Sequence, residues 1–277
     1  MSQIELHCDV HEGDGPFLLL VHGILSSRAQ WEPNLLALSR VTRPVVVELW
    51  GHGRSPAPAD PGAYHPNAYV AAFETLRKRL GASRWLVCGQ SLGATLTLRY
   101  ALDHPERLLA QVFTNSTSAL ADAEWVAGIR AGGAEQADAI ERGGRAMLEK
   151  VPLHPLRARR LPPEVQEALV SDAKLLDPRG LADTIRYTVP ESTLRERVTE
   201  NRVPTLLVCG ERDRRFEAQR RFAERHLPHL EVVAVDAGHA VNIEAADAFD
   251  AAVIDFLERT GALQSHRTGV LQAHRAG

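Results

Sequence analysis

The sequence predicts an α/β fold with a mostly parallel central sheet and helices on both faces. Short apolar runs rich in valine and leucine alternate along the chain with longer stretches of helical periodicity, and this alternation is typical of strand–helix units. The apolar runs are continuous, as expected of strands that are covered on both faces. We expect core strands at residues 17–21, 45–49, 85–88, 108–113, 205–209 and 230–235.

Helical stretches connect these expected strands. Gly81 and Pro105 lie just past two of them, at positions where helices commonly stop. Ahead of the first core strand, residues 3–10 alternate loosely and predict an edge strand that forms a hairpin through residues 12–15. The expected helices span residues 31–40, 66–80, 92–103, 216–226 and 245–259.

One long region interrupts the alternation. Residues 118–201 contain no strand-like run, and their helical patterns are broken at Gly132-Gly133, Gly143-Gly144 and Pro162-Pro163. Because strands and helices alternate again after Val203-Pro204, the region is an insertion within a larger unit. We therefore predict a core formed by residues 1–117 and 202–260, a helical insertion at 118–201 and a loose C-terminal tail at 261–277.

Composition excludes several classes of protein. The chain has 277 residues, of which 44% are hydrophobic and 24% charged, with a net charge of −3, so it is neither disordered nor electrostatically suited to nucleic acid or an anionic membrane. No apolar run reaches the roughly 18–20 residues that span a bilayer, and residues 1–10 show no secretory signal. Three widely separated cysteines, Cys8, Cys88 and Cys209, are expected to be reduced thiols in a cytoplasmic protein.

The most specific local pattern is Gly89-Gln90-Ser91-Leu92-Gly93. It follows an apolar run and precedes a helical stretch, and a serine on such a tight turn has its hydroxyl held clear of the backbone. The amide N–H of Leu92 points into the same space. A glycine-rich turn with a spectator serine is the alternative interpretation, and the strand–turn–helix context disfavours it. We predict that Ser91 is a nucleophile.

A serine nucleophile needs a general base, and the base needs a group that orients it. Among twelve histidines, His239 is the one in the C-terminal half that lies in a loop after an expected core strand. Asp213 follows the strand at 205–209 and is the predicted orienting acid, with Glu211 and Asp236 as rivals. All three predicted catalytic residues follow strand ends, where open α/β sheets place their sites. No histidine pair has metal-ligand spacing, so we expect no metal and no cofactor.

At this point the chain resembles the α/β-hydrolase family, over about residues 15–115 and 203–260. The resemblance implies that His22-Gly23 begins an oxyanion loop, that the N–H of Ile24 complements that of Leu92, and that the insertion forms a helical cap over the pocket. Ser26, Glu48 and Ala94 stand where many relatives have glycine, aspartate and glycine. The motifs that carry the resemblance are Val21-His22-Gly23, Trp31, Leu49-Trp50-Gly51-His52-Gly53-Arg54-Ser55, Gly89–Gly93, Gly210–Asp213 and Gly238-His239.

Serine at this turn favours attack on an activated carbonyl, whereas relatives that displace a group at an alkyl carbon have aspartate there. We predict a serine hydrolase that cleaves a small or medium carboxylic ester or lactone through an acyl-enzyme. One alternative is a C–C bond hydrolase that acts on a diketone-type ring-cleavage product. The acidic substrates of such enzymes usually demand a pocket arginine. Another alternative is a non-catalytic ligand receptor on the same fold.

The cap is expected to set the choice of a small-molecule substrate. Trp125, Met147 and Tyr187 are the candidate substrate-binding residues; the other interpretation is that such side chains pack the cap onto the core. No nucleic-acid or membrane partner is expected, and the oligomeric state stays open. Further candidates for lining the pocket are Ile129, Leu148, Leu156 and Leu169.

Overall fold

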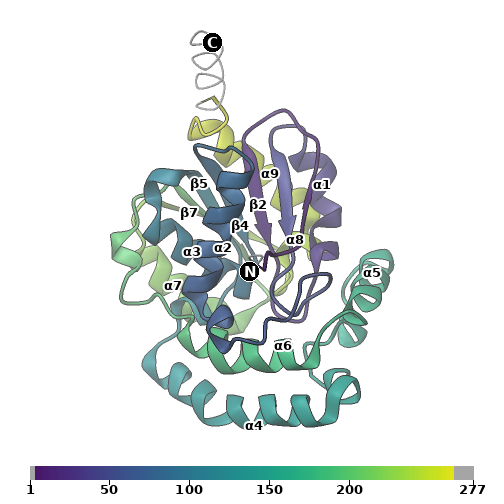
Figure 1. Cartoon of the computed structure of the whole chain (residues 1–277). Helices are drawn as coiled ribbons and strands as arrows, with labels where there is room; N and C mark the ends of the chain where they lie inside the picture. Colours follow the sequence, from purple (N-terminus) through teal and green to yellow (C-terminus); the bar gives the residue numbers. More distant parts are fainter. Residues whose placement is uncertain (1–3, 265–277) are drawn as a thin grey trace.

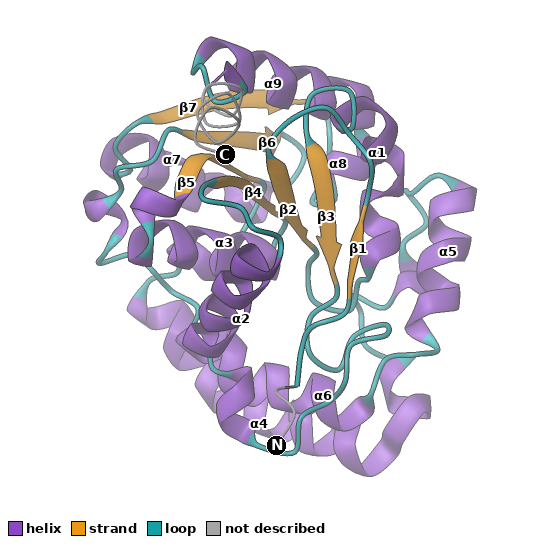
Figure 2. Cartoon of the chain, turned by 45° about the horizontal axis from the view of Figure 1, so that its top comes forward, coloured by secondary structure: helices purple, strands orange, loops and turns teal. Residues whose placement is uncertain are grey.

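A seven-stranded sheet organises the part of the chain that the computed structural model describes, residues 4–264 (Figures 1 and 2). The strand order is β1-β3-β2-β4-β5-β6-β7, and only β1 runs antiparallel to its neighbour in this described part. The predicted α/β class with a mostly parallel sheet is therefore confirmed. The strands are β1 (Cys8–Val10), β2 (Phe17–Val21), β3 (Arg43–Val47), β4 (Trp85–Gly89), β5 (Leu108–Phe113), β6 (Thr205–Gly210) and β7 (Leu230–Val235).

The predicted N-terminal hairpin is wrong. Strand β1 pairs with β3, placing Cys8 opposite Val47, and β2 lies on the other side of β3. The connection between β1 and β2 instead passes across the start of β3. A Cβ on Gly13 would lie 1.9 Å from the carbonyl oxygen of Thr42, so glycine is required at this close crossing. The glycines in this segment mark a crossing and not a tight hairpin turn.

Helices cover both faces of the sheet. Helices α1 and α9 lie on one face and α2, α3 and α7 on the other (Figure 2). Leu18 and Leu20 of β2 pack towards α1 and α9, whereas Leu19 and Val21 pack towards α2 and α3, which explains why the apolar run is continuous. The core helices are α1 (Glu32–Leu38), α2 (Pro66–Arg79), α3 (Leu92–Asp103), α7 (Glu217–His226), α8 (Val241–Glu244) and α9 (Ala246–Arg259).

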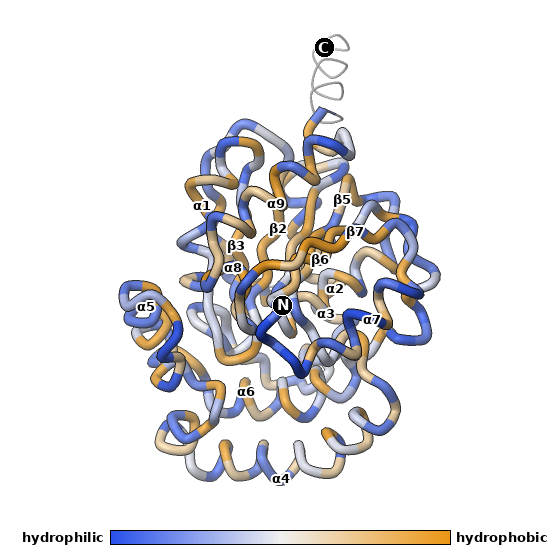
Figure 3. The backbone as a smooth tube through the Cα atoms, turned by 180° about the vertical axis from the view of Figure 1, so that it is seen from behind, coloured by the Kyte–Doolittle hydropathy of each residue, from blue (hydrophilic) through white to orange (hydrophobic). Residues whose placement is uncertain are grey.

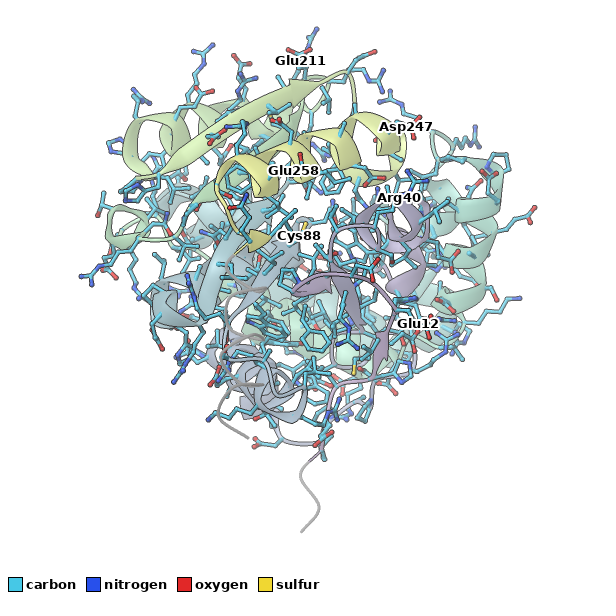
Figure 4. All side chains as sticks on the ribbon, turned by 90° about the horizontal axis from the view of Figure 1, so that it is seen from above. Glu12, Arg40, Cys88, Glu211, Asp247 and Glu258 are labelled. Carbon is cyan, nitrogen blue, oxygen red and sulfur yellow. The ribbon has the colours of Figure 1, made fainter. Side chains whose placement is uncertain are left out.

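Hydropathy follows this layered arrangement. Figure 3 shows hydrophobic residues concentrated in the central strands and hydrophilic residues along outer helices such as α7. Cys88 on β4 is buried in the interior (Figure 4), and burial raises the pKa of its thiol. Within residues 4–264, no helix has the length and apolar character needed to cross a bilayer.

The region between β5 and β6 is helical and lies beyond the carboxyl ends of the parallel strands, with α4 (Ala123–Leu148) outermost in Figure 1. It also contains α5 (Pro163–Ala173) and α6 (Pro178–Asp183). The expected break at Gly132-Gly133 is wrong, because α4 runs through it; the backbone leaves helical geometry at Gly144, where φ is 55°. The boundaries of core, insertion and tail stay a prediction, and residues 265–277 of the predicted tail lie outside the described residues.

The insertion is attached to the core by an apolar cluster and by polar contacts. Val165 and Leu169 of α5 pack against Ala29 and Ile243 of the core. Helix α4 packs against α6 around Ile140. Helix α5 therefore lies over the core loops that carry Ala29 and Ile243, while α6 packs on the loop at Gly51.

Candidate active site

The turn that carries Ser91 has strained backbone geometry. Ser91 has φ 52° and ψ −115°, in the left-handed half of the conformational map that L-residues rarely adopt. A Cβ on Gly93 would lie 2.1 Å from the carbonyl oxygen of Val21, and one on Gly89 would lie 2.4 Å from the backbone of Gly93. Only glycine fits at these two positions, which is the physical basis of the pattern seen in the sequence.

A pocket of about 610 Å³ opens where these loops meet the insertion. Ser91, Asp213 and His239 all line it, as does Ile24. Leu92 is not among the lining residues; it is the first residue of α3, where backbone N–H groups have no acceptor within the helix. The structure thus brings the three residues of the predicted triad, and one of the two predicted oxyanion donors, to a single cavity.

His239 and Asp213 are joined by a short hydrogen bond. The distance between His239 Nδ1 and Asp213 Oδ2 is 2.7 Å, and the Asp213 carboxylate is almost fully buried. Burial would raise the pKa of Asp213, but the hydrogen bond and charge of His239, together with Asn115 and Arg215, lower it to about 2. An ionised carboxylate accepts, so Nδ1 carries the hydrogen and Nε2 is left to take a proton.

The two rival acids lie away from this pair. Glu211 is exposed at the edge of the molecule (Figure 4). Asp236 is 80% exposed and pairs with Arg212 at 3.0 Å. Of the three candidate orienting acids, Asp213 is the one that is hydrogen-bonded to the imidazole of His239.

Sequence reasoning missed Glu244, which holds the loop around His239. Its carboxylate, 8% exposed, accepts hydrogen bonds from the backbone N–H of Gly238 at 2.9 Å and of Ala240 at 3.3 Å. These N–H groups flank His239 on both sides, so Glu244 positions the imidazole without touching it. A carboxylate on the short helix that follows the loop was the available signal, but no spacing rule distinguishes it from a solvated surface residue.

Two buried histidines support the loop that contains Ile24. His52 Nε2 accepts from the N–H of Leu25 at 3.3 Å, and His22 Nε2 accepts from the N–H of Leu49 at 3.1 Å. Burial lowers the pKa of His22 to about 3 and that of His52 to about 4, so both imidazoles are neutral acceptors near neutral pH. Leu25 has φ 61°, and its hydrogen bond to His52 helps to stabilise that unusual conformation.

A second contact missed by sequence reasoning ties the insertion to this same loop. Asp172 on α5 accepts from Ser27 Oγ at 2.8 Å and from the Arg54 guanidinium at 3.1 Å. Arg54 also pairs with the buried carboxylate of Glu48 at 3.3 Å. Glu48, one of the departures from the family pattern, is therefore held in a polar network with Arg54, Asp172 and Ser27.

The structure places the predicted substrate-binding residues elsewhere. Trp125 lies in the first turn of α4, Met147 packs against the apolar cluster between α4 and α6, and Tyr187 is 38% exposed. None of the three is among the residues that line the pocket; Trp125 and Met147 belong to α4, which forms the outer layer of the insertion (Figure 1). The pocket is lined instead by residues 152–155 and 157–161, together with Leu169 of α5.

Within residues 4–264, no group of three His, Cys, Asp or Glu side chains is arranged to hold a metal ion. The polar side chains that line the pocket carry hydroxyls, imidazoles, amides, carboxylates and guanidiniums.

Comparisons with known proteins agree with this fold. A family model described as the alpha/beta hydrolase fold matches residues 16–246. A Bacillus subtilis protein provisionally named 2-succinyl-6-hydroxy-2,4-cyclohexadiene-1-carboxylate synthase is 28% identical over 87% of this chain and 89% of its own length. Carboxylesterase YbfK of the same organism is 25% identical over 88% of this chain and 81% of its own length.

Among solved structures, the chain is similar to the enol-lactonase from Burkholderia xenovorans LB400. The sequence identity is 26%, the TM-score is 0.77, and the match covers 91% of this chain and 96% of that one.

Proposed function

The chain belongs to the α/β-hydrolase fold family, and from that premise we propose that it is a serine hydrolase that cleaves a small or medium carboxylic ester or lactone. The observation that carries the proposal is the pocket that Ser91 shares with the hydrogen-bonded pair of His239 and Asp213. The names of its relatives, a carboxylesterase and an enol-lactonase among them, support this reaction class.

In the proposed mechanism, Ser91 Oγ attacks the carbonyl carbon while His239 Nε2 takes the hydroxyl proton. Asp213 holds the imidazole tautomer and stabilises the imidazolium. The backbone N–H groups of Leu92 and Ile24 donate to the oxyanion, and each such donor is typically worth about 3 kcal/mol of transition-state stabilisation.

The carbon–oxygen bond to the leaving alcohol then breaks, and the alcohol takes the proton from His239. Water attacks the acyl-enzyme with His239 again as base. The bond between the acyl carbon and Ser91 Oγ then breaks, His239 returns the proton to Ser91 Oγ, and the carboxylic acid leaves.

Carbon–carbon bond hydrolysis is the second candidate, and one observation favours it. Substrates of that reaction are acidic and need a cationic pocket, and several arginines line this one. The same triad would attack the ketone carbonyl of a vinylogous diketone, with a carbon leaving group in place of an alcohol.

The test is a panel of 4-nitrophenyl esters of graded acyl length, with a lactone and a vinylogous diketone added, run on wild type and Ser91→Ala. We expect ester or lactone turnover that Ser91→Ala abolishes while its circular dichroism stays that of wild type. Turnover of the diketone alone would favour the second candidate. A fluorophosphonate probe separates an enzyme from a receptor, since rapid labelling at Ser91 requires an activated nucleophile.

A further inference from the structure

The pocket around Ser91 is cationic in a chain whose net charge is −3. Its lining contains six arginines and two carboxylates, those of Asp213 and Glu244. Both carboxylates are already engaged, Asp213 with His239 and Glu244 with the loop that carries it. The arginines are Arg157, Arg159, Arg160, Arg212, Arg214 and Arg215.

Four of these guanidiniums lack a protein partner. Arg212 pairs with Asp236 and Glu244, and Arg215 lies 3.5 Å from Asp213. For the other four, residues 4–264 supply no ion pair, side-chain hydrogen bond or ring contact. Within residues 4–264, six arginines in all lack such a partner. Four of them line this pocket, and the other two are Arg40 and Arg202. The unpartnered arginines therefore gather around this pocket.

The four arrive from two sides of the cavity. Arg157, Arg159 and Arg160 belong to the segment of the insertion between α4 and α5, and Arg214 directly follows Asp213 on the core. Leu25, Leu153, Leu161, Leu169 and Ile243 contribute apolar surface to the same pocket. The cavity thus combines an apolar interior with positive charge on both the insertion side and the core side.

All four guanidiniums are exposed to solvent at the pocket, where an anionic group on a bound substrate could reach them. A guanidinium binds a carboxylate through two parallel N–H···O bonds, and clustered positive charge raises the local concentration of anions. We propose that the substrate is an ester or lactone bearing an apolar chain and a free carboxylate, which Arg160 and Arg214 bind. The substrate class rests on the proposed hydrolase function; the anion site can be tested without it.

Two ester substrates of nearly equal size, one with and one without a free carboxylate, show how much that negative charge contributes to turnover. In 4-nitrophenyl hexanoate a methyl group replaces the free carboxylate of 4-nitrophenyl hydrogen adipate. The wild type is expected to favour the adipate ester in kcat/KM by about tenfold or more, the size of one charge-assisted hydrogen bond. Raising the salt concentration from about 0.02 M to 0.3 M should reduce this preference by screening.

The variant Arg160→Gln/Arg214→Gln is expected to lose about tenfold in kcat/KM on the adipate ester and less than about twofold on the hexanoate. Arg40→Gln/Arg202→Gln is the matched control, because it makes the same change of charge. Arg40 precedes β3 and Arg202 precedes β6, at the edge of the sheet opposite to the pocket. This control should behave as wild type on both esters.

Equal turnover of the two esters, or an unchanged pocket variant, would overturn the carboxylate proposal while Ser91-dependent hydrolysis still stood. If neither ester is cleaved, calorimetric titration with adipate and with 1,6-hexanediol tests the anion site directly. Stronger binding of adipate to wild type than to the pocket variant supports the site even then. Equal binding of adipate by the two proteins contradicts it.

Discussion

Asp213 and His239 lie 26 residues apart in sequence and meet at 2.7 Å, carboxylate oxygen to imidazole nitrogen. Loops after β6 and β7 carry them, and these strands are neighbours in the sheet. Register places Gly210 opposite Val235, so both loops leave the sheet at the same level. The parallel pairing of two strands therefore sets the position of the base relative to its acid.

Replacing Asp213 by asparagine tests the consequence of this pair. Asn at this position donates as well as accepts, which favours the wrong imidazole tautomer, so we expect kcat to fall by about 10³–10⁴ with little change in Tm. Glu211→Gln is the control and should stay within about twofold of wild type, because Glu211 is exposed. Equal loss in both variants would mean that the orienting acid is assigned wrongly.

Buried titratable groups predict how stability depends on pH. His22 and His52 have pKa values of about 3 and 4 in the folded chain, against about 6.5 unfolded, so the unfolded state binds more protons between these values. The contribution of these two histidines to the free energy of unfolding is present above pH 6.5 and is lost as pH falls towards 4. Asp250 acts in the opposite direction, because burial raises its pKa to about 7, and its contribution is lost as pH rises through 7.

Asp250→Asn should therefore steepen the pH dependence. Between pH 5 and 6 the unfolded state of the wild type binds about one proton more at these groups than the folded state does. In the variant the difference is about two protons. The slope of unfolding free energy then rises from about 1.4 to about 2.7 kcal/mol per pH unit. Urea unfolding at several pH values measures it, and Asn34 can still donate to the asparagine oxygen. A variant slope no steeper than that of wild type would contradict the assignment.

Glu244→Gln probes a residue that positions His239 from a distance. The amide offers one acceptor oxygen where the carboxylate offers two, so one flanking N–H loses its partner and the imidazole is held less well. We expect kcat to fall about tenfold, with KM little changed, because the Glu244 carboxylate is engaged by the loop around His239 and is not free to bind substrate. Glu258→Gln, an exposed change on α9 (Figure 4), serves as control. A rise in KM alone would indicate a role in substrate binding instead.

Two glycine substitutions should have effects of opposite sign. In Gly132→Ala the new methyl group meets no atom within 4 Å on an exposed helix, so the variant should gain about 0.5–1 kcal/mol from helix propensity. In Gly93→Ala the methyl group would lie 2.1 Å from the carbonyl oxygen of Val21, which forces β2 and α3 apart. Urea unfolding should show a loss of more than about 3 kcal/mol there; a neutral result would mean that the turn is looser than its geometry indicates.

Local patterns predicted the fold, and the three predicted catalytic residues line a single pocket. The strand at 230–235 was predicted from a continuous apolar run, and the turn at Ser91 from glycines that backbone contacts demand. The order of the strands at the N-terminal edge was not predictable in this way, because the partner of β1 depends on how the chain passes β3. A glycine that allows a crossing looks the same in sequence as one that allows a hairpin.

The composition of the pocket was the part that sequence could not supply. Large apolar residues of the insertion, such as Trp125, were reasonable candidates, yet the packing of α4 against α6 places them in another layer. Three of the arginines that line the cavity lie between α4 and α5 and the other three lie in the segment after β6, where no long helical or strand periodicity shows which way a side chain points. Glu244 was missed for a similar reason, since its partners are backbone N–H groups.

The hydrogen bond between Ser27 and Asp172 links helix α5 to the core loop that contains Ile24. Ser27 caps the short helix that follows the loop of Ile24, and Asp172 belongs to the helix that overhangs the cavity. Lifting α5 to admit a ligand would break this bond and release one anchor of the loop that contains the predicted donor. The position of the proposed oxyanion donor is therefore coupled, through this one hydrogen bond, to the seating of α5 on the core.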